Sequence, residues 1–255
     1  YNLAAQSFVK TSFTTPISTS EVTALGTLRI LEMIRCLLPK CKFYQASSSE
    51  MYGKIKSRSQ NENTNFYPRS PYAISKVFAH YATKNYRESH NIFACSGILF
   101  NHESPLRGEE FVTRKIVKNL CEIKIGKRKY LELGNLYAKR DWGHAKDYVE
   151  AMWKMLQKKK ADDYVIATNK SYSIKYFINQ CCKHLKIKLK WVGKGILEKG
   201  IDSNTKKTII KINQKYFRPA EVNYLKGNYL KAKRELKWYP KTNISKLIKI
   251  MIDEE

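Results

Sequence analysis

The chain has 255 residues, and its 48 lysines and arginines against 22 aspartates and glutamates give a formal net charge of +26. Hydrophobic residues make up 43% and aromatic residues 12% of the sequence, which excludes a disordered chain and allows a substantial core. No apolar run reaches the roughly 18 residues that span a membrane and no signal peptide opens the chain, so we expect no membrane partner.

The positive charge is spread along the chain rather than gathered into one arm. It comes from 37 lysines and 11 arginines, whereas recognition of phosphates and bases favours the planar, bidentate guanidinium of arginine. The densest run, Lys158-Lys159-Lys160, is typical of a solvated turn. We therefore expect no nucleic-acid partner. A basic nucleic-acid-binding protein stays an alternative, and its affinity for DNA would fall steeply with salt.

The six cysteines show no Cys-x-x-Cys spacing and no paired histidines that would complete a metal site. They are Cys36, Cys41, Cys95, Cys121, Cys181 and Cys182. We expect reduced thiols, no bound metal and a cytoplasmic location.

Strand-like and helix-like stretches alternate along the chain, which predicts an α/β fold with a mainly parallel sheet. The first helix is expected to start at Ser18-Thr19-Ser20-Glu21, which has the form of a capping box, and to end at Leu38. A short buried strand is expected over residues 42–46.

The next helix has a clear start signal, because Ser70-Pro71 combines a good N-cap with a residue that suits the first helical position. This helix is expected over 72–89. A strand is expected over 92–100, and residues 101–105 are expected to break it.

The chain beyond about Phe111 is expected to be more helical. Its predicted elements are helices over 145–157, 174–185 and 244–254 and a strand over 164–167. We interpret residues 1–105 as a sheet domain and residues 106–255 as a smaller mixed lobe, from which some chain crosses back.

Polar side chains follow two of the predicted strands, at residues 47–50 and 101–103. Ligands bind at the carboxyl ends of strands in open parallel sheets. Between these two segments, Tyr72 and Lys76 lie four residues apart and so share one face of the predicted helix. The Lys76 ammonium is expected to lower the pKa of the Tyr72 phenol and to favour it as a proton acceptor.

The Tyr-x-x-x-Lys spacing is weak support by itself. In a chain with 17 tyrosines and 37 lysines, chance gives roughly 2.5 matches, and the sequence has three. Tyr72 and Lys76 differ from the other two pairs, which we interpret as surface pairs, because they open a capped helix after a Ser-Ser-Ser-Glu strand end.

Longer phrases occur at residues 43–53, 66–73, 97–105, 111–115, 139–153 and 216–222. In this order they closely resemble the GDP-mannose 4,6-dehydratase family of the extended short-chain dehydrogenase superfamily. Related epimerases and dehydratases share the Tyr-x-x-x-Lys pair but not usually the longer phrases. The resemblance implies a partial Rossmann-type, doubly wound parallel sheet for residues 1–105. It implies a smaller mixed α/β lobe, mainly for binding a nucleotide sugar, for residues 106–255.

The resemblance also implies a reaction, the dehydration of GDP-D-mannose to GDP-4-keto-6-deoxy-D-mannose on the route to GDP-fucose, with NADP as a recycled hydride carrier. Tyr72 would take the proton of the C4 hydroxyl, while Lys76 would hold the nicotinamide ribose. Ser48 would hydrogen-bond the C4 oxygen as charge develops. Glu50 matches the acid/base that removes the C5 proton before water leaves C6, and a plain surface carboxylate is the alternative for it.

Binding positions follow from the same resemblance. Those for the cofactor are Leu3, Ala4, Ala5, Gln6, Ser7, Tyr72, Lys76, His102 and Arg107. Those for the substrate are Asn101, Val112, Lys115, Arg140, Arg218 and Glu221. Cations suit a diphosphate, and a carboxylate can accept hydrogen bonds from guanine. A structural histidine is the alternative for His102, and a salt-bridge partner is the alternative for Arg140. A homo-oligomer is expected for the complete enzyme.

The glycine-rich phosphate loop of the family is not in this sequence. Residues 1–7 resemble the end of the family's fourth strand, so about 80–100 residues are expected to precede Tyr1 in a complete enzyme. Phe8 and Ser18 also differ from the family's usual His and Tyr. The 255 residues alone are therefore expected to bind NADP poorly, to aggregate and to lack activity. A catalytically inactive relic is the alternative to an active enzyme.

Overall fold

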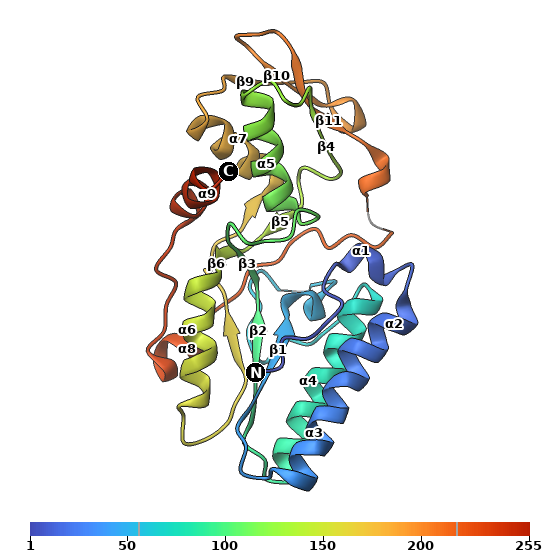
Figure 1. Cartoon of the computed structure of the whole chain (residues 1–255), viewed down its shortest axis with the longest axis vertical. Coiled ribbons are helices and arrows are strands. Elements are labelled where there is room, and N and C mark those ends of the chain that lie inside the picture. The colour runs from blue at the N-terminus through green and yellow to red at the C-terminus, as the bar shows by residue number, and fades with distance from the viewer. Residues whose placement is uncertain (56, 218) are drawn as a thin grey trace.

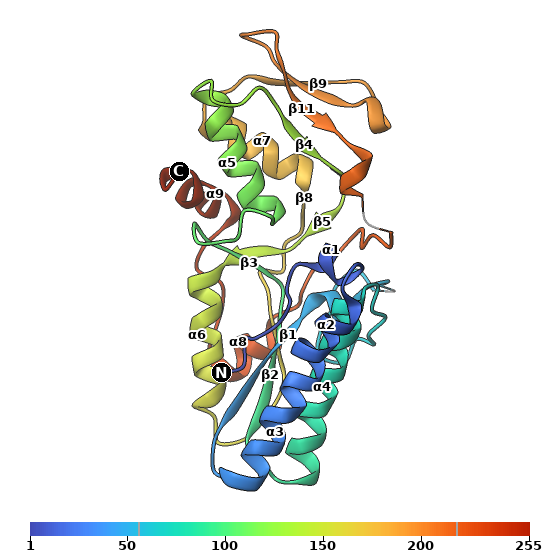
Figure 2. The same cartoon turned by 45° about the vertical axis from the view of Figure 1, so that its right-hand side comes forward.

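The computed structural model describes residues 1–55, 57–217 and 219–255. A parallel sheet with helices on both faces forms one end of the molecule, and a smaller lobe with its own sheet forms the other end (Figures 1 and 2). Within the described part of the chain, no helix combines the length and the apolar character needed to cross a membrane.

The larger end is built on a three-stranded parallel sheet in the order β1-β2-β7. Its strands are β1 (Phe43–Ser48), β2 (Ala94–Leu99) and β7 (Tyr164–Ile166), and every residue in them is buried. Parallel strands with helices on both faces are buried on both sides and are therefore mostly apolar. The predicted strands and the α/β fold class are confirmed.

Successive residues of these strands face opposite layers of helices. Phe43 packs with α3 (Gly26–Leu37) and α4 (Pro71–Ser89), whereas Tyr44 packs with α6 (Ala145–Leu156) and α8 (Leu230–Leu236). Figure 1 shows these two helical layers on either side of the strands. Because α6, β7 and α8 all come after residue 106, the later part of the chain crosses back to complete this end.

The first helix begins earlier than the sequence predicts. Before α3 the chain forms α1 (Val9–Ser12), α2 (Pro16–Ser20) and a π-helical turn over Glu21–Leu25. Pro16 starts α2 because its fixed φ suits the first helical turn. The expected capping box is wrong: the hydroxyls of Thr19 and Ser20 donate to carbonyls four residues earlier, inside the helix.

The N-terminus of α4 is fixed as predicted. The Ser70 hydroxyl accepts a hydrogen bond from the Ala73 amide at 3.1 Å, and Pro71 occupies the first helical position. The loop that leads into α4 passes close to Gly53, which follows the 3₁₀ turn after β1 and has φ +51°. A Cβ at Gly53 would lie 1.9 Å from the Tyr67 carbonyl oxygen, so this close approach requires glycine.

The smaller lobe has a mixed sheet in the order β4-β11-β10-β9. Its strands are β4 (Leu131–Leu133), β9 (Leu189–Val192), β10 (Lys199–Asp202) and β11 (Thr208–Ile212). The helices α5 (Val112–Lys124), α7 (Ile174–His184) and α9 (Ile244–Asp253) share an apolar core with this sheet. The predicted helices over 145–157, 174–185 and 244–254 are confirmed, whereas β9, β10 and β11 were not predicted.

Two short ladders lie between the two ends. β3 (Asn101–Glu103) pairs in parallel with β6 (Trp142–His144), and β5 (Lys139–Arg140) pairs antiparallel with β8 (Tyr172–Ser173). The strand over 92–100 ends where expected, since β2 stops at Leu99, but residues 101–103 form a new strand that was not predicted. The chain leaves the sheet of β1 after β2, and its backbone finds new hydrogen-bonding partners in β6.

The N-terminal segment borders the outer edge of β1. The Asn2 amide donates to the Tyr44 carbonyl at 2.8 Å, and the Asn2 carbonyl accepts from the Ala46 amide at 3.1 Å. Asn2 thus pairs in parallel with Gln45, as a strand next to β1 would.

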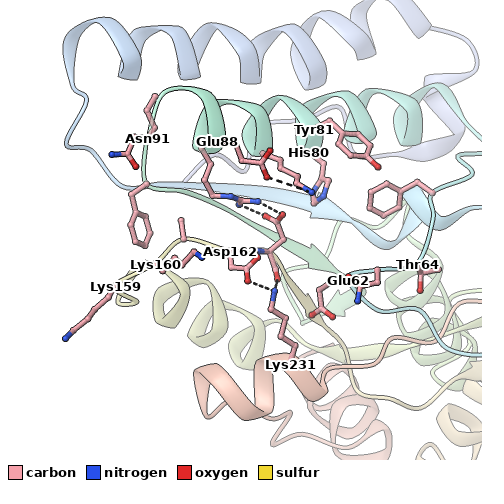
Figure 3. Close-up of a pocket in the computed structure, with 18 of the residues that line it drawn as sticks. Glu62, Thr64, His80, Tyr81, Glu88, Asn91, Lys159, Lys160, Asp162 and Lys231 are labelled. Carbon is pink, nitrogen blue, oxygen red and sulfur yellow. Dashed lines mark hydrogen bonds and ion pairs between the residues drawn. The ribbon is translucent and has the colours of Figure 1, made fainter.

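An ion pair closes the opposite end of the sheet, where β2 and β7 begin. Arg87 of α4 donates two hydrogen bonds to the Asp163 carboxylate at 2.8–2.9 Å, and Asp163 also accepts from the Ser96 amide. Burial acts to raise the pKa of Asp163, but Arg87, His80 and the Ser96 amide together outweigh it, so this pKa lies below its ordinary value. The pair lines a cavity of about 780 Å³, in which Lys231 also bonds Asp162 (Figure 3).

The buried face of α4 includes a charged side chain, Lys76, which is 3% exposed. Its Nζ donates to the carbonyl oxygen of Ala46 in β1 at 2.8 Å. Burial of the charged form lowers the pKa of Lys76 from 10.5 to about 8.

We predict that the cost of burying this ammonium appears in the pH dependence of stability. Between about pH 8 and 10 the unfolded chain holds the Lys76 proton more tightly than the folded chain, so the free energy of unfolding rises with pH. The full effect is about 3 kcal/mol. Urea denaturation should show this rise in the wild type relative to Lys76→Met. Lys84→Met, on the exposed face of α4, should leave it in place. Parallel pH profiles for the wild type and Lys76→Met would contradict the prediction.

Candidate active site

The end of β1 presents two of the expected catalytic side chains. The Ser48 hydroxyl accepts a hydrogen bond from the Glu50 amide at 3.2 Å, which caps a short 3₁₀ turn over Ser49–Tyr52. Met51 and Tyr52 are fully buried and anchor this turn in the core. Glu50 is held by the same turn but stays half-buried, and so can meet a ligand at the carboxyl end of β1.

The first two turns of α4 bring the other two expected catalytic side chains, Tyr72 and Lys76, to the same place. Tyr72 is 8% exposed, and Ser48 and Glu50 lie close enough to its phenol to shift its pKa, Ser48 downwards and Glu50 upwards. Lys76 Nζ lies 5.8 Å from the centroid of the Tyr72 ring. The structure thus brings Ser48, Glu50, Tyr72 and Lys76 together, from two elements far apart in sequence.

The electrostatics of this cluster differ from the sequence expectation. The pKa of Tyr72 is raised to about 12, chiefly by burial and also by Glu50, whereas Ser48 and the charge of Arg107 act to lower it. The expected lowering of this pKa by Lys76 is wrong for the ligand-free protein. The Lys76 ammonium bonds the Ala46 carbonyl and is itself destabilised by burial, so it does not offset the loss of water around the phenol.

His102 and Arg107 border this cluster from the segment after β2. His102 Nδ1 lies 3.0 Å from the Phe100 carbonyl oxygen, and the ring stacks on Tyr148 with centroids 5.1 Å apart. Burial lowers the pKa of His102 to about 4, so the ring is neutral at physiological pH. The Arg107 guanidinium lies 3.5 Å from the centroid of the Phe111 ring. Both side chains therefore contact an aromatic ring, and the Arg107 Nε also forms an ion pair with the buried Glu103 carboxylate at 3.3 Å.

The expected substrate residues fall into two groups. Arg140 of β5 donates to Glu221 at 3.2 Å, which brings these two together. Lys115 of α5 lies apart from them, with its Nζ 3.5 Å from the centroid of the Tyr216 ring. Asn101 opens β3 and Val112 opens α5. Arg218 lies outside the described residues.

The expected cofactor segment, residues 3–7, connects the edge strand position at Asn2 to α1. Leu3 and Ser7 are exposed. The Gln6 amide donates to Thr23 at 3.3 Å, which fastens the segment to the π-helical turn. This segment and the catalytic cluster come from neighbouring strands of the same sheet.

Sequence reasoning missed a buried carboxylate beside Arg140. Asp141 is fully buried and accepts hydrogen bonds from the amide and hydroxyl of Thr168 and from the Gly227 amide. Burial raises the pKa of Asp141 to about 6 despite these bonds. Asp141 therefore ties β5, the segment after β7 and the segment that carries Glu221 to one another. The sequence did hold a signal for Asp141, because it follows Arg140 in the longest of the phrases that resemble the family, residues 139–153.

Two further observations bear on what the site can hold. Among the described residues, no group of three or more histidine, cysteine, aspartate and glutamate side chains is placed to hold a metal ion. The cavity of about 780 Å³ lies beside Asp163, and its labelled Asp162 and Lys231 pair with each other (Figure 3). Ser48, Glu50, Tyr72 and Lys76 do not line it. We therefore assign that cavity no part in catalysis.

Comparison with known proteins identifies the family of the chain. Residues 1–251 match the model of the family described as GDP-mannose 4,6 dehydratase. The chain is 53% identical over 254 residues to GDP-mannose 4,6 dehydratase of Drosophila melanogaster, covering 99% of this chain and 64% of that protein. It is 47% identical to the human protein of that name, with 99% and 68% covered. The chain thus spans about two thirds of the length of these relatives.

Solved structures show the same fold at low sequence identity. RMD from Pseudomonas aeruginosa, complexed with NADPH, superposes with a TM-score of 0.83 at 20% identity, covering 99% of this chain and 79% of that one. DesIV, a dTDP-glucose 4,6-dehydratase from Streptomyces venezuelae, also gives 0.83, at 19% identity and with 99% and 71% covered. With the family match over nearly its whole length, the chain belongs to the GDP-mannose 4,6-dehydratase family.

Proposed function

We propose that this chain carries the catalytic and substrate-binding residues of an NADP-dependent lyase that converts GDP-D-mannose to GDP-4-keto-6-deoxy-D-mannose, a step towards GDP-fucose. The observation that carries the proposal is the meeting of Ser48, Glu50, Tyr72 and Lys76 at the carboxyl end of β1. All four residue types suit the reaction, and a relic without activity should lose them as readily as surface residues.

The proposed cofactor fits the residues around Tyr72 in part. An ammonium has three donors, so Lys76 can bond ribose hydroxyls while it bonds the Ala46 carbonyl. Arg107 contributes a cation that also lowers the pKa of Tyr72, although its Nε forms an ion pair with the buried Glu103 carboxylate at 3.3 Å. NADP would supply the hydride acceptor for C4. Two structural neighbours that are described as bound to NADPH or NAD support a nicotinamide cofactor.

Tyr72 is placed to accept the proton of the C4 hydroxyl. A phenol with a pKa of about 12 is protonated at neutral pH, so it becomes a base only when a cation or a hydrogen-bond donor stabilises its charged form. Ser48 lowers the pKa of this phenol, and its hydroxyl can bond the C4 oxygen as well, because a hydroxyl both donates and accepts. Ser48 and Tyr72 thus act on the same sugar oxygen.

Glu50 is placed to remove the C5 proton once C4 is a ketone. Its electrostatic coupling to Tyr72 puts its carboxylate on the same side of the sugar site. A carboxylate is a suitable base for a proton next to a carbonyl. The same carboxylic acid can then protonate the leaving hydroxyl at C6, so that water departs.

Arg140 and Glu221 are proposed to hold the nucleotide. Arg140 bonds the Lys139 carbonyl and Glu221, and the planar, bidentate guanidinium suits a phosphate. Glu221 is less buried than Arg140 and can accept from guanine N–H groups. Asn101, Val112 and Lys115 complete the proposed substrate set from the described residues, and Arg218 belongs to it by resemblance.

A second copy of the chain is the proposed protein partner. Large apolar side chains are exposed along α3 and α4: Ile30, Met33, Leu37, Ile74 and Phe78. Adjacent apolar side chains on two helices are typical of surfaces that pair with another subunit. Light scattering should show a dimer or larger assembly, and a monomer at all concentrations would contradict this. A cytoplasmic location is proposed from the six free thiols.

The function is tested directly with the protein that carries this chain. Incubated with NADP and GDP-mannose, it should form a GDP-sugar that is lighter by one water, and NMR should show a methyl group at C6. UDP-glucose and dTDP-glucose serve as controls and should not react. Turnover of either control sugar without turnover of GDP-mannose would contradict the proposal.

The division of labour between Glu50 and Tyr72 gives a second prediction. Glu50→Gln should lower product formation by about 10²–10⁴-fold because the C5 proton loses its base. Oxidation at C4 does not need Glu50, so absorbance of the reduced cofactor should still appear in a single turnover. Tyr72→Phe should abolish both signals. Equal loss of both signals in Glu50→Gln would contradict the assigned role.

A further inference from the structure

Three lysines gather around Tyr216, which ends a 3₁₀ turn over Gln214–Tyr216. Their Nζ atoms lie 3.5 Å (Lys115), 4.9 Å (Lys215) and 5.7 Å (Lys10) from the centroid of the Tyr216 ring. Each ammonium group is attracted to the electron-rich face of the ring, but the ammonium groups repel one another. Three ammonium groups around one ring therefore favour an anion nearby.

Lys10 reaches this ring from the other end of the chain. It belongs to α1, which packs on α4, the helix that carries Tyr72. Its Nζ donates to the carbonyl oxygen of Lys215 at 2.7 Å, a contact between residues 205 positions apart. In Figure 2, α1 lies beside the segment that leads out of β11. Lys10 thus joins the catalytic end of the molecule to the lobe that carries Lys115.

The charges of this cluster are not balanced within the described residues. One carboxylate, Glu132, forms an ion pair with a member of the cluster, at 3.2 Å from Lys215 Nζ. Lys115 is half-buried, and this burial lowers its pKa. Of three positive charges, one is offset and two are not. The diphosphate of a nucleotide sugar carries two negative charges, which matches this excess.

We propose that Lys10 is a substrate-binding residue, which together with Lys115 holds the diphosphate of the nucleotide sugar across the boundary between α1 and the smaller lobe. This inference rests on the proposed function, which assigns Lys115 but not Lys10. The ring of Tyr216 fixes the ammonium groups, and the Lys215 carbonyl orients Lys10 towards them. Lys10 then adds one charge to the diphosphate without contacting the reacting carbons.

The test is calorimetric titration of the protein that carries this chain with GDP-mannose at low and high salt. Lys10→Met should weaken binding about tenfold at low salt, because a charge-assisted hydrogen bond is lost. The difference from the wild type should narrow at high salt. Lys10→Arg keeps the charge and should restore most of the affinity. Lys40→Met removes an exposed lysine remote from the cluster and should bind as the wild type does.

The outcomes separate this inference from the function on which it rests. No binding of GDP-mannose by the wild type would overturn both. Binding by the wild type that Lys10→Met leaves within twofold would overturn the role of Lys10 alone. A weakened Lys10→Met that Lys10→Arg does not rescue, or a difference that persists at high salt, would show a structural effect and would also overturn that role.

Discussion

The hydrogen bond from the Lys76 ammonium to the Ala46 carbonyl holds the catalytic geometry together. An ammonium taken out of water needs a strong acceptor, and here the acceptor is a backbone oxygen of β1. This fixes the rotation of α4 against the sheet. Tyr72, one turn earlier on the helix, then meets Ser48, two residues later on the strand. One costly buried charge thus sets the position of the whole proposed catalytic cluster.

A second constraint keeps the nucleotide-binding residues in register with that cluster. Asp141 collects three hydrogen bonds from segments that begin at Thr168 and Gly227, and its own backbone continues from Arg140. Burial of this carboxylate is costly, as its raised pKa shows, but the hydrogen bonds that it accepts hold three chain segments together. Lys10 and Tyr216 form a separate contact between the two ends of the molecule on the side of α1.

Local signals predicted the elements that carry catalysis, since Ser70-Pro71 and the Ser-Ser-Ser-Glu strand end act through neighbouring residues. The four catalytic positions came from the resemblance, and the structure brings them together. The start of α2 was mispredicted because Pro16 outweighs a capping pattern two residues later. The alternating Lys and apolar residues of β9 are a strand signal that the basic composition obscured. The pKa of Tyr72 depends on burial and on Arg107, which no spacing in the sequence reveals.

The central claim is that one GDP-mannose molecule meets Ser48, Glu50, Tyr72 and Lys76 at the carboxyl end of β1. A crystal structure of the protein that carries this chain, with GDP-mannose bound, tests it most directly. We expect the C4 oxygen within hydrogen-bonding distance, about 2.6–3.2 Å, of both Tyr72 and Ser48, with the Glu50 carboxylate facing C5. A sugar bound elsewhere, such as in the cavity beside Asp163, with the end of β1 unfilled, would contradict the account.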